Sequence, residues 1–188
     1  MNIHEILKLD RAGLQRMMEN GHPVDAHALE NYTYYGISLG LPRWVERLSW
    51  QKFMKTFYRD PTTKTLRGWN IRTIDDGLDS PWVPKERNGH PLIFGHYEIQ
   101  DNQAKNLPDC LDHALLIDYS RGGQGGNGIL NGLRDPIVRL ESESHDHLLG
   151  RSYFAMGGRY IGTPSYFLLI RGKPINEAEL PSSWTADI

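Results

Sequence analysis

The sequence predicts an all-β protein: an eight-stranded antiparallel barrel preceded by short N-terminal helices. Between Tyr32 and Arg171 the chain divides into about eight short runs, most of which alternate apolar with polar residues. Gly, Pro, Asn or Asp stands at nearly every boundary, and no long helical pattern intervenes. This spacing is typical of a barrel or sandwich. Eight strands suit a small closed barrel, whose interior can hold one small ligand.

The composition indicates one ordinary globular domain. The chain has 188 residues and a formal net charge of −2, so it lacks the basic character that nucleic-acid binding needs. We expect an N-terminal helical segment over 1–30, the barrel over 32–171 and a tail over 172–188. No stretch approaches the roughly 20 apolar residues of a membrane span. The single cysteine, Cys110, and the charged N-terminus favour a reducing, cytoplasmic location.

The elements follow in order. Residues 2–20 have helical periodicity, with Asp10 as the N-cap of a second short helix. Pro42 suits the first turn of another short helix. The predicted strands are Tyr32–Ser38, Lys52–Arg59, Thr65–Thr73, Leu92–Ile99, His113–Tyr119, Asp135–Glu141, Leu148–Ala155 and Ser165–Arg171. The turn that begins at Asp60 joins the second and third strands as a hairpin, because Asp and Pro favour tight turns. We expect residues 75–90 to form a long irregular connection.

Three short motifs do not indicate a phosphate-binding, metal-binding or catalytic site. The glycine-rich stretch 121–132 lacks the Walker pattern and a following helix, so we interpret it as a connection between strands. His145 and His147 form an H-x-H pair in a polar turn, without a third ligand nearby in sequence. Cys110 lies near His113, but we expect an unreactive thiol. The sequence predicts neither a metal site nor a cofactor.

Polar residues on the strands leave two interpretations open. In the strand Leu92–Ile99, the side chains of Phe94, His96 and Glu98 share one face because side chains alternate. If these polar faces point outward, they are ordinary solvated surfaces. If some of them point into the barrel, they hold buried charges beside aromatic rings, which is typical of a small-molecule pocket. If the protein is an enzyme, the catalytic candidates are His96, Glu98 and Asp118, because burial can shift their pKa values towards neutrality.

The ligand-binding candidates follow from the inward interpretation. Arg139 or Arg151 would pair with an anionic group, because a guanidinium holds a carboxylate through two hydrogen bonds. Trp69, Phe94 and Tyr153 would form the apolar wall. The sequence therefore predicts a small, mostly apolar ligand that carries a polar or anionic group.

Several segments stand in the order found in one family of barrels. They are Tyr35–Gly40 (YGISLG), Trp50–Phe57, Leu115–Tyr119 (LLIDY), Leu133–Val138 (LRDPIV), Leu148–Tyr153 (LLGRSY) and Tyr166–Arg171 (YFLLIR). Together they resemble the bacterial lipocalin-like (calycin-type) proteins, whose first strand carries a Gly-x-Trp-x-Gly signature. Gly36 and Gly40 match that signature, but Ser38 stands where the family has Trp.

The resemblance implies a ligand-binding barrel with an apolar cavity. In the family the signature Trp plugs one end of the barrel, so Ser38 implies a more open end. Relatives of this architecture include binders of hydrophobic molecules, isomerases, cyclases, decarboxylases and haem proteins with one His ligand. The fold alone does not choose among these activities. The expected partner is a small hydrophobic molecule, and the sequence leaves a homodimer open.

Overall fold

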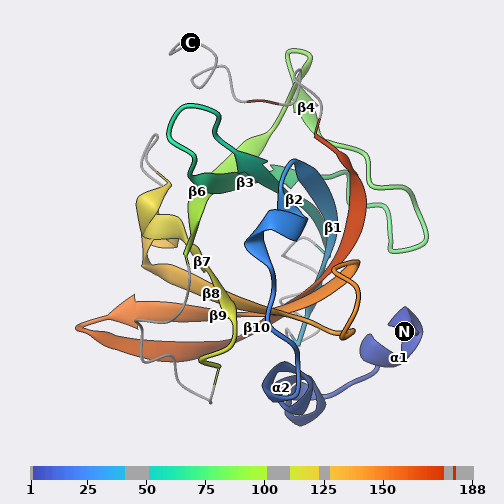
Figure 1. The fold of residues 1–188 in the computed structure, drawn as a ribbon. Coiled ribbons are helices and arrows are strands. Elements are labelled where there is room, and N and C mark those ends of the chain that lie inside the picture. The colour runs from blue at the N-terminus through green and yellow to red at the C-terminus, as the bar shows by residue number, and fades with distance from the viewer. Residues whose placement is uncertain (1, 41–50, 101–110, 123–127, 176–179, 181–188) are drawn as a thin grey trace.

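Eight antiparallel strands close into one barrel. A computed structural model describes residues 2–40, 51–100, 111–122, 128–175 and 180. The strands of the barrel are β1 (Tyr32–Leu39), β2 (Lys52–Arg59), β3 (Leu66–Arg72), β6 (Ile93–Gln100), β7 (Leu115–Asp118), β8 (Leu133–Arg139), β9 (His147–Met156) and β10 (Arg159–Pro174). Around the barrel their order is β1-β10-β9-β8-β7-β6-β3-β2. The predicted fold class is therefore confirmed (Figure 1).

Most predicted strands lie within two residues of the observed ones. The hairpin from β2 to β3 forms as expected, because the Asp60 carboxylate accepts hydrogen bonds from the backbone N–H groups of Thr62 and Thr63. The last strand was predicted too short. β10 begins at Arg159, and a register shift between Gly162 and Tyr166 lets it continue past the glycine and Pro164.

The connection over 75–90 contains structure that the sequence did not predict. A two-stranded sheet forms from β4 (Glu86–Arg87) and β5 (His90–Pro91). The helix expected after Pro42, and Cys110, fall outside the described residues. Within the described part of the chain, no helix has the length and apolar character needed to cross a membrane.

The N-terminal helices cover part of the outside of the barrel. They are α1 (Ile3–Ile6) and α2 (Arg11–Glu19), and the Asp10 carboxylate caps α2 by accepting from Gly13 N–H at 2.8 Å. Leu14 and Met18 are buried against outward-facing strand residues such as Val138 and Leu168. The wall of the barrel is therefore apolar on both faces at this side, which blurs the alternation of polar and apolar residues.

One end of the barrel is plugged by the segment before β1. The short helix η1 (Ala26–Leu29) lies across this end in Figure 1. Leu29 is fully buried in a cluster with Tyr34 and Phe57 from the strands. His22 and Arg139 exchange backbone hydrogen bonds of 2.9 and 3.0 Å, which attach the same segment to β8.

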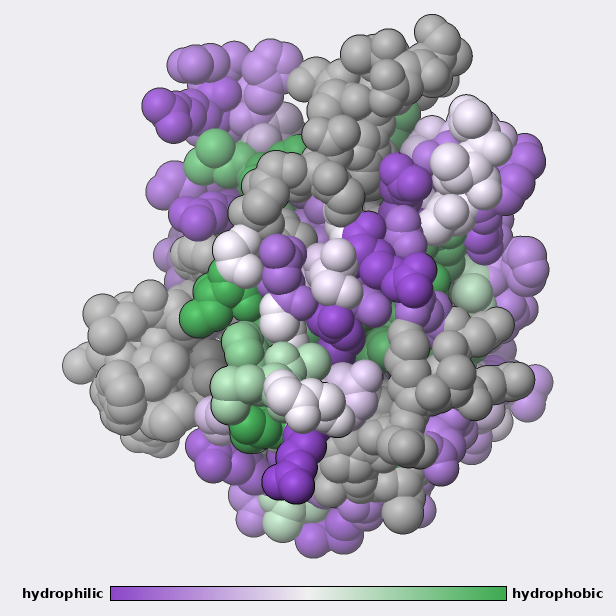
Figure 2. All heavy atoms as spheres, turned by 90° about the vertical axis from the view of Figure 1, so that its left-hand side faces the viewer, coloured by the Kyte–Doolittle hydropathy of each residue, from purple (hydrophilic) through white to green (hydrophobic). Residues whose placement is uncertain are grey.

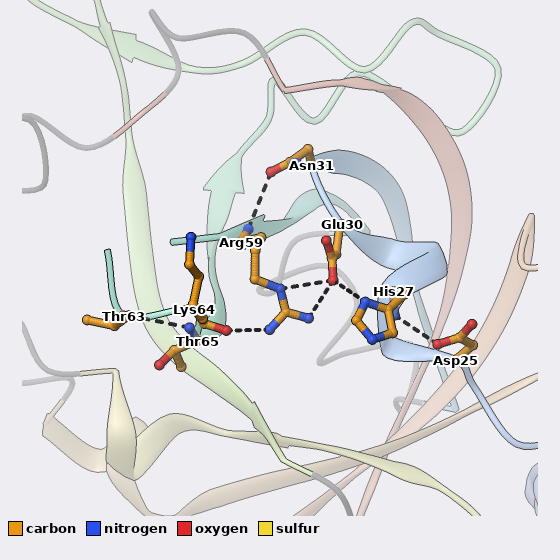
Figure 3. A network of polar contacts seen from close by, with 8 residues as sticks. All are labelled: Asp25, His27, Glu30, Asn31, Arg59, Thr63, Lys64 and Thr65. Atoms are coloured by element: carbon orange, nitrogen blue, oxygen red, sulfur yellow. Dashed lines mark hydrogen bonds and ion pairs between the residues drawn. The ribbon is translucent and has the colours of Figure 1, made fainter. Parts of the chain in front are cut away.

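A polar network fastens this plug to the β2–β3 hairpin (Figure 3). The Glu30 carboxylate accepts from Arg59 Nε at 2.9 Å and from Arg59 Nη2, and it also contacts His27. Arg59 Nη1 donates to the Lys64 carbonyl at 2.6 Å, and Arg59 N–H donates to Asn31 Oδ1 at 3.3 Å. The hydrogen bonds from Arg59 lower the pKa of Glu30.

Few large apolar side chains are exposed among the residues that the structure describes. Figure 2 shows one side of the molecule, which is largely hydrophilic, with apolar groups in small areas. Met156 and Ile161 are exposed on the β9–β10 hairpin, which projects from the barrel in Figure 1. Most large apolar side chains instead lie inside the barrel or under the segments that cover it.

Candidate ligand-binding site

A cavity of about 150 Å³ occupies the end of the barrel opposite η1. Ser38 and Phe53 line it, and they lie far along β1 and β2 from the Tyr32–Phe57 pair beside the plug. Its aromatic residues are Phe53, Phe94, Tyr119 and Phe167. Its polar residues are Ser38, Lys55, Asn70, Asp135, Ser152 and Ser165. The cavity therefore combines an apolar wall with a cluster of polar residues, the polar group, which is the usual composition of a small-molecule site.

Lys55 lies at the centre of the polar group. Its side chain is fully buried, and Nζ donates to Asn70 Oδ1 and to the Tyr119 hydroxyl, both at 2.8 Å. Asn70 is itself fixed, because its amide nitrogen donates to the carbonyls of Phe94 at 3.4 Å and Gly95 at 3.1 Å. The ammonium is thus held by neutral acceptors.

Aromatic rings surround the same ammonium. Lys55 Nζ lies 4.5 Å from the ring centroid of Tyr97, 5.2 Å from that of Tyr119 and 5.5 Å from that of Phe167. Tyr97 and Tyr119 meet edge to face at 5.4 Å. Ring faces attract a cation, and this attraction partly offsets the loss of water around the buried charge.

Asp135 on β8 provides the opposite charge. Its side chain is almost fully buried and receives hydrogen bonds from Tyr119 and Ser152. Its other oxygen, Oδ1, has no hydrogen-bond partner among the described residues. Because a buried carboxylate oxygen without a donor costs free energy, Asp135 offers an unused acceptor beside the cavity.

Burial shifts the pKa values of this group. Loss of water lowers the pKa of Lys55 to about 8, although the charge of Asp135 opposes this shift. Burial raises the pKa of Asp135, and Lys55 opposes that change in turn. Burial also raises the pKa of Tyr119 well above its ordinary value. Lys55, Tyr119 and Asp135 therefore form a chain in which both charged ends are biased towards their neutral forms.

A bulge in β6 decides which residues face the cavity. Gly68 pairs with Tyr97, whereas Asn70 pairs with Phe94, so β6 has one extra residue at this point. Gly95 has φ of +56°, a value that favours glycine. The bulge lets both Phe94 and Tyr97 face inward. The predicted shared face of Phe94, His96 and Glu98 is therefore wrong, because alternation does not continue through a bulge.

The structure separates the three residues predicted to form an apolar wall. Phe94 lines the cavity. Gly68 occupies an inward position on β3, so the next side chain, that of Trp69, points outward. Trp69 is buried outside the barrel with Met54 and Ile71. Tyr153 is buried in the outer cluster that α2 covers.

Neither arginine of the predicted anion site is among the residues that line the cavity. Arg139 Nε donates to the Pro23 carbonyl at 2.7 Å, at the plugged end. Arg151 Nη1 donates to Gln15 Oε1 at 2.6 Å and lies against the ring of Tyr166, so it attaches α2 to the outer wall. Both contacts are with the N-terminal segment.

The three predicted catalytic residues also lie outside the cavity lining. Glu98 and Asp118 are cross-strand neighbours on β6 and β7. Asp118 pairs with Arg134 at 3.1 Å and accepts from Ser120 N–H at 2.9 Å, which begins the short helix η2 (Tyr119–Arg121). His96 is half-buried, and burial lowers its pKa. Their roles in catalysis stay predictions.

Sequence reasoning missed Lys55 and Asp135, although a signal was present. Lys55 stands two residues from both Phe53 and Phe57, and Asp135 stands two residues before Ile137. Charges at such positions share the face of apolar residues and point into the core. Asn70, Tyr119 and Ser152 carry no comparable signal.

The histidines show no metal or haem site within the described residues. His145 Nε2 accepts from Asp25 N–H at 3.0 Å, and His147 Nδ1 lies 3.1 Å from Glu141. No group of three ligating side chains is found in the described ranges. Among the described residues, none of those that line the cavity is a histidine.

The architecture agrees with the resemblance in outline. A closed barrel of eight antiparallel strands is consistent with a lipocalin-like fold, and Ser38, at the signature position, lines the cavity. No family model matches the chain, and no curated protein or solved structure is significantly similar to it.

Proposed function

We propose that this barrel, as a lipocalin-like protein, binds a small and mostly apolar molecule whose single polar group meets Lys55 and Asp135. The observation that carries the proposal is the buried chain Lys55–Tyr119–Asp135 beside a cavity with an aromatic wall. Apolar residues in place of the two charged ones would usually give a core at least as stable, because removing two charges from water costs free energy. Binding of a ligand through Lys55 and Asp135 would explain why these two charges are buried.

The size and lining of the cavity limit the ligand. Apolar cavities of about 150 Å³ in other proteins hold a molecule the size of benzene, and the volume here is similar. Asp135 Oδ1 needs a donor, whereas a protonated Lys55 has three donors and uses two on described partners. A hydroxyl satisfies both groups. An anionic group would pair with Lys55 and favour protonation of Asp135, whose pKa is already raised.

Binding of three single-ring probes tests this proposal. Ligand-observed NMR titrations compare toluene, benzyl alcohol and benzoate on the full chain. We expect saturable binding of benzyl alcohol, about tenfold tighter than toluene, because one good polar contact contributes about 1.4 kcal/mol. The variant Lys55→Met should lose most of that difference. Failure of all three probes to saturate the protein would contradict the proposal.

The matched control is Lys52, a second buried lysine on β2. Its Nζ pairs with Asp76 at 2.5 Å and donates to the carbonyls of Ser80 and Pro81, away from the cavity. Lys52→Met should leave the preference for benzyl alcohol unchanged. Equal losses in both variants would show that the effect comes from general destabilisation.

The remaining predictions are proposals of the same kind. We propose a cytoplasmic protein, and light scattering at two protein concentrations tests the homodimer. Substituting Arg139 or Arg151 by Leu tests the anion anchors that the sequence suggested. Because both contact the N-terminal segment, a loss of benzoate affinity at unchanged stability would support the anchor role.

A further inference from the structure

We propose that Lys55 is a nucleophilic amine that captures the carbonyl carbon of a small apolar aldehyde or ketone as an imine. The inference rests on the proposed function, since the carbonyl compound would occupy the same cavity. It adds a covalent step and a substrate class. Amines in apolar, water-poor pockets are the ones that proteins use for this chemistry.

Comparison of two lysines on one strand supports this role. Lys52 and Lys55 are both fully buried on β2. Lys52 has a carboxylate and two carbonyls for its three protons, so its charged form is fully satisfied. Lys55 has two neutral acceptors, Asn70 and Tyr119, and its third position has no partner among the described residues. Only Lys55 lines the cavity.

The contacts of Lys55 suit a neutral amine. A neutral amine has two protons and one lone pair, so it keeps its donation to Asn70 Oδ1 while its lone pair accepts from the Tyr119 hydroxyl. A carbonyl oxygen that takes over the Tyr119 hydrogen bond frees the lone pair for attack. Burial favours this form, because it lowers the pKa of Lys55 to about 8 and raises that of Asp135.

Tyr119 provides the route by which the amine becomes neutral. The Lys55 ammonium gives a proton to the Tyr119 oxygen while the Tyr119 hydroxyl proton passes to Asp135. The product is a neutral amine and a neutral carboxylic acid, so charge is conserved. No external base is required.

The reaction then balances without an added reagent. Lys55 Nζ attacks the carbonyl carbon, and one nitrogen proton moves to the carbonyl oxygen, which gives a carbinolamine. Protonated Asp135 donates its proton to the new hydroxyl, the carbon–oxygen bond breaks and water leaves. The nitrogen lone pair forms the C=N bond. The product is a cationic iminium beside the Asp135 carboxylate, so the buried ion pair is restored.

Reductive trapping on the full chain tests the proposal. Benzaldehyde, near one equivalent, is the probe, sodium cyanoborohydride reduces the iminium, and peptide mass spectrometry locates the benzyl group. We expect one benzyl group on Lys55 before the exposed Lys64 and Lys85 react. Benzylation of Lys55 that is no faster than that of the surface lysines would overturn the proposal. This readout uses the unmodified protein, so it does not depend on whether a variant folds.

The pH dependence gives a second readout. The charged or titratable groups around Lys55 are Asp135 on β8, Tyr119 in η2 and Tyr97 on β6, with Arg134 beside Asp135. Because the proton moves within the pair, the trapping rate at Lys55 should already be near its maximum below pH 8 and should fall above it, as the proton shared with Asp135 is lost to solvent. Ordinary lysines instead react faster as the pH rises towards their pKa of about 10.4. A rate at Lys55 that rises with pH in the same way as that at Lys64 would contradict the role.

Variants separate the failure of this inference from that of the proposed function. Lys55→Arg cannot form an imine and should abolish trapping, whereas Lys52→Arg should leave the rate unchanged. Asp135→Asn should slow trapping about 100-fold, which is the usual scale of general acid catalysis. Saturable binding of benzyl alcohol without trapping of benzaldehyde would refute the imine and keep the binding site. Absence of both would refute both proposals.

Discussion

Lys55 and Asp135 project into the barrel from diametrically opposite strands and meet through the hydroxyl of Tyr119. Three strands separate β2 from β8 in either direction around the barrel. Lys55 Nζ donates to Tyr119, and Tyr119 donates to Asp135. A polar connection therefore crosses an interior that is otherwise largely aromatic and aliphatic. It couples the protonation states of Lys55 and Asp135, whose strands are not neighbours in the barrel.

Removing Lys55 should destabilise the fold strongly. In Lys55→Met the Asp135 carboxylate stays buried without a cation, which typically costs about 3–5 kcal/mol in the free energy of unfolding. Urea denaturation at pH 7 measures this. The double variant Lys55→Met/Asp135→Asn should recover most of the loss, because no isolated charge remains. Lys52→Met should cost less, about 1 kcal/mol, since its partner Asp76 is half exposed and can be hydrated. Equal costs would contradict the assignment.

Stability should rise between about pH 8 and pH 10. The pKa of Lys55 is about 8 in the folded protein and about 10.4 in an unfolded chain. In this range the unfolded state binds more protons, so the free energy of unfolding increases with pH. Above pH 10 the sign reverses, because burial raises the pKa values of Tyr97 and Tyr119 and only the unfolded tyrosines ionise. Denaturation at several pH values tests this, and Lys55→Met should lack the rise.

The bulge glycine of β6 should be essential for the cavity. Gly95→Ala places a Cβ atom 2.8 Å from Asn70 Nδ2 at φ of +56°, so the Asn70 side chain that binds Lys55 must shift. We expect a loss of about 2 kcal/mol in stability and weaker binding of benzyl alcohol. Gly89→Ala is the control, because it has φ of +77° and open space around it. It should cost about 1 kcal/mol and leave binding unchanged. The same loss of binding in both variants would argue against the bulge.

Introducing the Trp of the lipocalin-like signature at position 38 should close the site. Ser38 lines the cavity at the position where the lipocalin-like signature has Trp. In Ser38→Trp the indole should occupy the volume available to a ligand, so benzyl alcohol binding is lost while the circular dichroism spectrum is retained. Ser38→Ala is the control and should bind normally. Unchanged binding in Ser38→Trp would show that the probes bind elsewhere.

The sequence by itself determined the fold class and most strand positions, because turn residues and side-chain alternation are local properties. The strand Lys52–Arg59 and the N-cap at Asp10 were predicted at the observed residues. The length of β10 was not, because a register shift carries it past Gly162 and Pro164.

The candidate site was decided by tertiary structure. Alternation does not say which face of a strand points inward when both faces are buried, as happens here beneath α2 and beside Trp69. The bulge at Gly95 then reverses the alternation within β6. Lys55 and Asp135 are 80 residues apart in the chain, and closure of the barrel brings them to the same hydroxyl. Contacts of this kind depend on the arrangement of all eight strands, so they cannot be predicted from local sequence patterns.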